Sequence, residues 1–112
     1  MAAGPSTDRE TYAPFILGRS LLLVDPGLTA KAGIFRRRTG WIGNGYDWQS
    51  VATTVLTMRH PDMSGRIAFD SSADMFVARG DPADLIILAG AMRTAYHDDG
   101  LLTDVLSRAV LD

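Results

Sequence analysis

The chain has 112 residues, of which 46% are hydrophobic and 21% charged, and its formal net charge is −2. This length accommodates one domain with a buried core, and so small a net charge does not by itself indicate a nucleic-acid or acidic-membrane partner. The absence of cysteine excludes disulfides, thiolate nucleophiles and cysteine-ligated metal sites.

The N-terminal segment, residues 1–11, is small and polar, and we expect it to be flexible. Residues 12–112 are predicted to form the single domain. The N-terminal segment lacks the apolar core of a signal peptide, and no part of the chain approaches the roughly 20 apolar residues of a membrane span. We therefore expect a cytoplasmic protein without a membrane partner.

Two short apolar runs, residues 12–18 and 20–25, open the domain. The dipeptide Gly18-Arg19 between them predicts a hairpin turn. Within the second run, residues 21–24 are apolar without alternation. This pattern indicates either a strand covered on both faces or a strand whose exposed face is itself a contact surface.

A helix is predicted next, over residues 29–38, with Thr29 as its N-cap and Gly40 as its stop. Three consecutive arginines at its C-terminal end form the densest charge cluster in the chain: Arg36, Arg37 and Arg38. Their position is explained by the helix dipole, which favours cations at a C-terminus. The alternative is a basic patch for phosphates, supported by Lys31 and the nearby rings of Trp41 and Tyr46.

Residues 43–48, with the sequence Gly-Asn-Gly-Tyr-Asp-Trp, predict a tight loop fixed onto the start of a helix. Gly43 and Gly45 permit left-handed backbone conformations. Asp47 is the predicted helix cap, because its carboxylate can accept hydrogen bonds from first-turn amides. We expect these three residues and Trp48 to support the loop structurally.

The helix after this loop is predicted over residues 47–60 and ends before Pro61. A hydrophobic staple between Tyr46 and Val51 would fix its entry angle. The residues at helical spacing that predict its buried face are Trp48, Val51, Ala52, Val55 and Leu56.

Residues 66–70 and 75–79 predict a second hairpin. Asp81 as N-cap and Pro82 at the first helical position then start a long helix. Its predicted buried face consists of Leu85, Leu88, Ala89, Met92, Ala95 and Tyr96. Residues 98–100 separate it from a last, shorter helix.

The order of elements is therefore ββααββαα. Strand pairs joined by short turns indicate an antiparallel sheet of about four strands with the helices packed on one face, so the predicted class is α+β.

Reactive groups are scarce. His60 and His97 both fall near helix C-termini, where the dipole alone explains them. The aspartate pairs 98/99 and 70/74 lie in turn-like sequence, where aspartate commonly bonds the local backbone. The glycine-rich loop lacks the lysine and hydroxyl of a phosphate-binding loop. We therefore expect no catalytic site, no cofactor and no metal.

The features that favour binding are aromatic and acidic. Trp41 and Tyr46 flank the glycine-rich loop, and such side chains are enriched at protein–protein hot spots. Asp98 and Asp99 belong to residues 81–112, which carry six acidic and two basic side chains. These four residues are the predicted partner-binding set.

Several segments together resemble the Immunity protein 51 family: residues 43–48, the stretch Ile-Ala-Phe-Asp at 67–70 followed by Met-Phe at 75–76, the ending Leu-Ser-Arg-Ala at 106–109, and the early Pro-Phe-Ile-Leu at 14–17. The similarity runs from about Pro14 to Asp112. The arginine cluster departs from it, because the first helix of such proteins is expected to be acidic.

The resemblance implies a small α+β immunity protein of a bacterial polymorphic toxin system, which neutralises a cognate toxin by stoichiometric binding and performs no catalysis. The alternative is a small nucleic-acid-associated module that uses Arg36, Arg37 and Arg38, which the acidic remainder of the chain disfavours. The sequence does not predict an oligomeric state.

Overall fold

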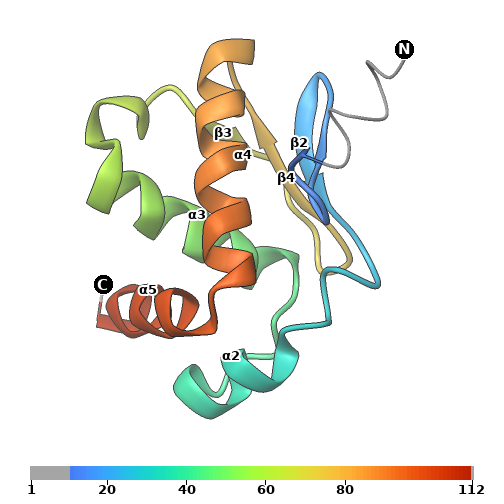
Figure 1. The fold of residues 1–112 in the computed structure, drawn as a ribbon, viewed down its shortest axis with the longest axis vertical. Helices are drawn as coiled ribbons and strands as arrows, with labels where there is room; N and C mark the ends of the chain where they lie inside the picture. Colours follow the sequence, from blue (N-terminus) through green and yellow to red (C-terminus); the bar gives the residue numbers. More distant parts are fainter. Residues whose placement is uncertain (1–10, 112) are drawn as a thin grey trace.

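The structure, a computed structural model, describes residues 11–111, so the segment expected to be flexible lies outside the described residues apart from Thr11. The described chain contains four strands, four α-helices and one short 3-10 helix. In chain order they are β1 (Ile16–Leu17), β2 (Ser20–Leu23), α2 (Ala32–Thr39), α3 (Gly45–Arg59), η1 (Pro61–Met63), β3 (Ala68–Phe69), β4 (Phe76–Arg79), α4 (Pro82–His97) and α5 (Asp99–Leu111). The helices gather on one side of the sheet (Figure 1). The predicted α+β class and the order ββααββαα are confirmed.

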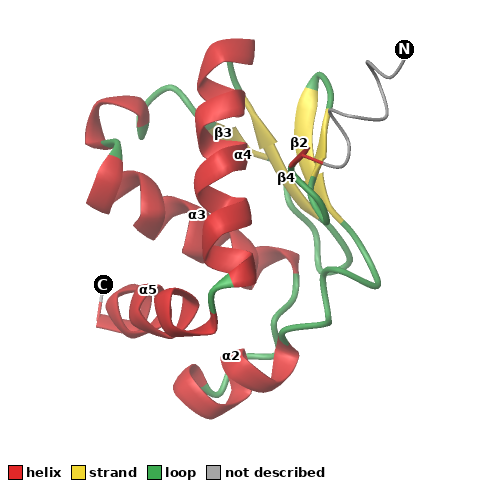
Figure 2. Ribbon diagram, viewed as in Figure 1, coloured by secondary structure: helices red, strands yellow, loops and turns green. Residues whose placement is uncertain are grey.

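The sheet is antiparallel throughout, with strand order β1-β2-β4-β3. In Figure 2 the strands lie together on one side of the molecule, next to the helices. Leu21 and Leu23 of β2 are fully buried. Leu22 lies between them on the opposite face, paired with Ile16 on one side and Val77 on the other, and this row lines a hollow of about 370 Å³. Among the described residues, therefore, no helix covers the second face of β2.

The predicted helix faces are confirmed. Every residue named for the buried faces of α3 and α4 is buried, the most exposed being Tyr96 at 6%. Trp48 of α3 stands among aromatic rings, with its centroid 5.0 Å from that of Phe35 and 6.1 Å from that of Phe15. Because Phe15 precedes β1 and Phe35 belongs to α2, one indole joins three parts of the chain.

The start of α2 corrects one prediction. The helix begins at Ala32, not at Thr29, and Thr29 is not its cap. Instead, the backbone N–H and the Oγ1 hydroxyl of Thr29 both donate to Oδ1 of Asp25, at 3.2 and 2.8 Å. Asp25 thus accepts the Thr29 hydroxyl in a turn that precedes α2, so this hydroxyl does not cap the helix. The predicted stop is confirmed, since Gly40 caps α2 in the left-handed conformation at φ +80°.

The predicted start of α4 is confirmed in position, with Asp81 as N-cap and Pro82 in the first turn. The Asp81 side chain, however, makes no capping hydrogen bond. The first-turn carboxylate of Asp84 is engaged instead by Arg66, which follows η1, and this contact ties the turn before β3 to α4.

Candidate functional site

The connection between α2 and α3 begins with a fixed exit from α2. The Thr39 hydroxyl donates to the carbonyl oxygen of Phe35 at 2.7 Å and accepts from the backbone N–H of Trp41 at 2.8 Å. The backbone N–H of Gly40 donates to the carbonyl oxygen of Arg36. These bonds satisfy polar groups that a helix end leaves free, and they set the direction in which the loop departs.

The two glycines of the loop serve different needs. Gly43 has a φ of +78°, and an added Cβ would lie 3.3 Å from Ala32 Cα and the Phe35 ring. Gly45 is the first residue of α3 and is not left-handed, contrary to the prediction. A Cβ there would overlap the carbonyl oxygens of Ser72 and Met75. Gly45 is therefore required by close approach of the β3–β4 turn rather than by backbone conformation.

The N-cap of α3 is Asn44, so the prediction that Asp47 occupies this position is wrong. The two residues form a reciprocal capping box: Asn44 Oδ1 accepts from the Asp47 N–H at 2.9 Å, and Asp47 Oδ2 accepts from the Asn44 N–H at 3.2 Å. Asp47 Oδ2 also accepts from the Gly43 N–H at 2.8 Å. One carboxylate thus holds two loop amides beside the positive end of the helix dipole.

Because α3 starts earlier than predicted, the staple between Tyr46 and Val51 does not form. Tyr46 is 54% exposed, whereas Val51 is fully buried. The residue at the fourth helical position is Trp48, whose indole nitrogen donates to the carbonyl oxygen of Leu28 at 3.0 Å. Tyr46 therefore does not form the staple, and its side chain faces solvent.

We give the name loop surface to three apolar side chains of the loop and of the first turn of α3: Trp41, Ile42 and Tyr46. Ile42 is 62% exposed, more than any other large hydrophobic side chain in the described residues. Trp41 is half-buried and packs against the core. Sequence reasoning missed Ile42, although its place between Gly40 and Gly43 leaves it little to pack against.

Asp98 and Asp99, which we call the acidic turn, already have partners within the chain. Only Asp98 lies between α4 and α5, because Asp99 is the first residue of α5, so the separation predicted over residues 98–100 is a single residue. Asp98 Oδ1 accepts from the Leu101 N–H at 3.0 Å, so it caps α5. Asp99 Oδ1 lies 2.9 Å from Lys31 Nζ, and this ammonium is 5.2 Å from the centroid of the Tyr96 ring. No hydrogen bond or ion pair within residues 11–111 joins the acidic turn to the loop surface.

Arg36, Arg37 and Arg38 are exposed in the last turn of α2. Across the described part of the chain no ion pair engages any of them. They lie one turn ahead of the loop surface in sequence. These three guanidinium groups are therefore accessible to solvent at the C-terminal end of α2.

The histidines lie where they were predicted. His60 is the C-cap residue of α3, and His97 is the last residue of α4. His97 Nε2 lies 2.8 Å from the carbonyl oxygen of Ala13. Within residues 11–111 no three His, Asp or Glu side chains are grouped closely enough to hold a metal ion. None of the described helices combines the length and apolar character needed to cross a membrane.

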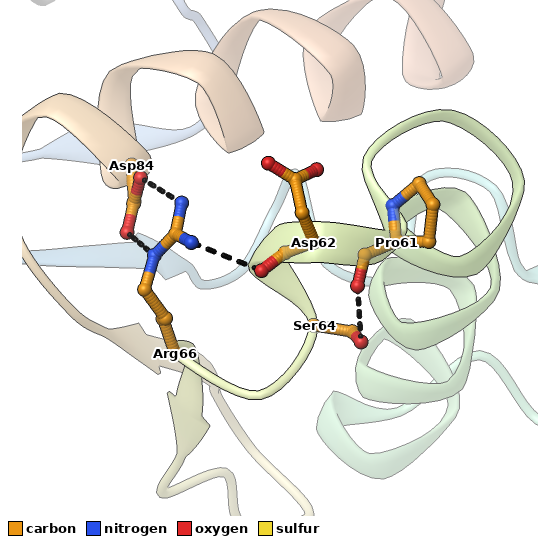
Figure 3. Close-up of polar contacts among 5 residues, drawn as sticks. All are labelled: Pro61, Asp62, Ser64, Arg66 and Asp84. Atoms are coloured by element: carbon orange, nitrogen blue, oxygen red, sulfur yellow. Dashed lines mark hydrogen bonds and ion pairs between the residues drawn. The ribbon is translucent and has the colours of Figure 1, made fainter.

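The best-formed ion pair joins Arg66 and Asp84 (Figure 3). Arg66 Nε lies 2.9 Å from Asp84 Oδ2, and Arg66 Nη2 lies 3.1 Å from Oδ1. A third donor, Nη1, reaches the carbonyl oxygen of Asp62 at 3.0 Å. Hydrogen bonding to Arg66 lowers the pKa of the Asp84 carboxyl and raises that of the guanidinium. Because both carboxylate oxygens are occupied and the group is held ionised, this pair is structural and not an acid–base centre.

Comparison with protein families matches residues 21–111, which is most of the chain, to Immunity protein 51. No curated protein and no solved structure gives a significant match. The matched range begins in β2 and includes every later element, among them the loop surface, the capping box and the acidic turn. The chain belongs to the Immunity protein 51 family.

Proposed function

We propose that this protein protects the producing cell by binding a cognate toxin stoichiometrically in the cytoplasm, without making or breaking a bond in it. Family membership supports a toxin as the partner. The loop surface supports the mode of action, because Ile42 on the loop and Tyr46 in the first turn of α3 are exposed large side chains on either side of backbone amides that are held by hydrogen bonds. Such apolar anchors on an ordered frame are typical of protein–protein hot spots.

The proposed contact set keeps Trp41 and Tyr46, with Ile42 added, and places Asp98 and Asp99 at its charged periphery. An interface of ordinary size covers roughly 800 Å² on each partner. Within it the three apolar side chains supply the buried centre. The acidic turn contributes to association rate and partner choice more than to affinity, because exposed charges act mainly by steering.

The test is co-expression with the toxin encoded beside the gene, followed by purification. We expect growth to be restored and a one-to-one complex to be recovered. Tyr46→Ala and Ile42→Ala should each weaken the complex by about tenfold or more, the usual loss at a hot spot. Ile16→Ala is the matched control, since Ile16 is 40% exposed on the far face of the sheet. Absence of rescue and of a complex would refute the proposal.

The alternative function, binding of nucleic acid through Arg36, Arg37 and Arg38, is less well supported by the structure. Two of the three residues expected to assist are engaged elsewhere: Lys31 is paired with Asp99, and Trp41 is half-buried against the core. A gel-shift series tests it directly, because binding by the arginines would weaken steeply with salt. We expect no retention even at low salt.

A further inference from the structure

The last turn of α2 carries more positive charge than the helix itself can balance. A helix C-terminus is equivalent to about −0.5 of an elementary charge, whereas three exposed arginines lie here: Arg36, Arg37 and Arg38. Two carbonyls that contribute to this negative end are already engaged, because that of Phe35 accepts from the Thr39 hydroxyl and that of Arg36 accepts from the C-cap N–H. The dipole therefore explains why a cation is favoured at this end, but not why there are three.

The neighbouring acidic groups do not balance this charge either. The helix α2 packs against α5 (Figure 1), but both acidic side chains of α5 are paired with other cations. Asp99 lies 2.9 Å from Lys31, and Asp104 lies 3.3 Å from Arg108. Within residues 11–111 no carboxylate forms an ion pair with any of the three arginines. Their charge is therefore available to a partner outside the chain.

The arginines lie beside the loop surface. Ile42 follows Arg38 by four residues, so their Cα atoms are at most about 15 Å apart. Arg36 is held near the same point, because its carbonyl oxygen accepts from the Gly40 N–H at 3.1 Å. An interface of roughly 800 Å², centred on Ile42, is equivalent to a disc about 16 Å in radius. A partner that covers Ile42 in this way therefore also reaches the last turn of α2.

The three side chains occupy the exposed part of this turn. Successive residues of an α-helix are about 100° apart, so three in a row span about 200°, and the other side is buried through Ile34 and Phe35. A partner on the exposed side therefore meets at least one guanidinium group. Loss of water from that group is unfavourable against a neutral surface. A carboxylate offsets this cost, because it accepts charge-assisted hydrogen bonds from arginine, often two at once.

We propose that the toxin presents an acidic surface of aspartate and glutamate side chains to the last turn of α2, beside its apolar contact with the loop surface. This inference rests on the proposed function and names the chemistry of the partner at that site. The arginines act mainly on association, because attraction between opposite charges raises the association rate constant by about 10-fold to about 1,000-fold in a salt-dependent way. The acidic turn does not reverse this attraction, since Asp99 is already paired with Lys31.

The first test is the rate at which the full chain associates with the purified toxin encoded beside the gene, measured by stopped flow. Salt is set at about 0.01 M and about 1 M, where charges act over about 30 Å and about 3 Å. Combining Arg36→Gln, Arg37→Gln and Arg38→Gln should lower the association rate constant about tenfold or more at low salt. At high salt the variant and the parent should differ little, because screening removes the attraction in both.

A second triple variant serves as the matched control. It replaces by glutamine three other exposed arginines that enter no ion pair in the described residues: Arg19, Arg59 and Arg93. The control removes the same total charge from the β1–β2 turn, from the C-terminal end of α3 and from α4, and it should keep most of the parent's rate. An equal loss in the two triple variants, or a parent rate indifferent to salt, would overturn the proposal. Circular dichroism checks that both variants are folded.

Cross-linking locates the contact. The sequence has a single lysine, Lys31, so Arg36→Lys, Arg37→Lys or Arg38→Lys each adds one defined amine. A carbodiimide joins amines to carboxylates, and mass spectrometry should find the new lysine coupled to aspartate or glutamate of the toxin. A complex in which none of the three lysines couples to the toxin would overturn the proposal.

The remaining outcomes separate this inference from the proposed function. Retention of nucleic acid by the parent chain, lost in the Arg36–Arg38 triple variant, would overturn the inference and assign the arginines to phosphate. A complex that forms without the expected rate loss or cross-link would refute the inference alone. Absence of any complex between the parent chain and the toxin would refute the proposed function, and this inference with it.

Discussion

The indole of Trp48 stacks on the phenol ring of Tyr96, with centroids 5.5 Å apart and planes inclined by 24°. Their polar groups bond to consecutive carbonyls of one turn: Tyr96 Oη donates to Gly27 at 2.9 Å, and Trp48 Nε1 donates to Leu28 at 3.0 Å. The stacked pair thereby fastens α3 and α4 to the segment that precedes α2. Burial raises the pKa of the Tyr96 phenol, so the group remains a donor at neutral pH.

Removing these two donors should destabilise the protein unequally. Tyr96→Phe deletes one hydrogen bond and should lower the free energy of unfolding by about 1 kcal/mol. Trp48→Phe also removes ring volume from a fully buried site and should cost about 2–3 kcal/mol. Urea unfolding followed by circular dichroism measures both. A Tyr96→Phe variant as stable as the parent would show that the bond to Gly27 is not formed in solution.

A methyl group at Gly45 should be far more damaging than one at Gly65. The Cβ of Gly45→Ala would overlap the backbone of residues 72 and 75, which cannot move aside without breaking the turn. The loss should be about 3 kcal/mol or more. Gly65→Ala is the control, since a Cβ there meets nothing within 4 Å. Thermal unfolding of the two variants makes the comparison, and equal midpoints would contradict it.

The capping box predicts that substitutions at Asn44 and Asp47 lower the free energy of unfolding in a coupled way. Asn44→Ala should cost about 1 kcal/mol, as is usual for an N-cap. Asp47→Ala should cost a similar amount, because it frees the Gly43 and Asn44 amides. Since each residue bonds to the other's backbone, the double variant should lose less than the sum. Strict additivity in chemical unfolding would argue that the two bonds act independently.

The Arg66–Asp84 pair predicts an acid-dependent contribution to stability. Because the pKa of Asp84 is lower in the folded chain than in the unfolded one, its contribution is full above the ordinary carboxyl pKa and is lost as pH falls through the folded value. Asp84→Asn should flatten part of the decline in unfolding free energy between about pH 5 and about pH 2. In an Arg66→Gln background the same change should have little further effect. Urea unfolding at a series of pH values tests both statements.

Much of the fold could be predicted because local rules and burial agreed. The apolar residues of α3 recur at helical spacing, and Pro61 ends that helix, so its face and its end followed from local pattern alone. The same holds for α4 after Asp81 and Pro82. The loop residues Trp41 and Tyr46 were singled out by composition, but their exposure depends on where α3 begins.

The errors arose where two side chains compete for one role. Asn44 and Asp47 are both good caps, and only the reciprocal bonds between them show which is the N-cap. Thr29 satisfies the composition of a cap, yet Asp25 captures its hydroxyl first. The pairing of Lys31 with a residue 68 positions later could not be inferred from local sequence.

Gly45 packs closely against the β3–β4 turn, and this contact affects how the chain would bind a partner. Its N–H donates to the Ala73 carbonyl oxygen at 3.2 Å, so the loop that carries Ile42 is anchored to the β3–β4 turn at one end and to α2 at the other. The loop loses most of its conformational entropy when the chain folds. Little further entropy would therefore be lost when it binds a partner. In the toxin complex proposed above, this loop would bind with little rearrangement, and we expect the complex to dissociate slowly.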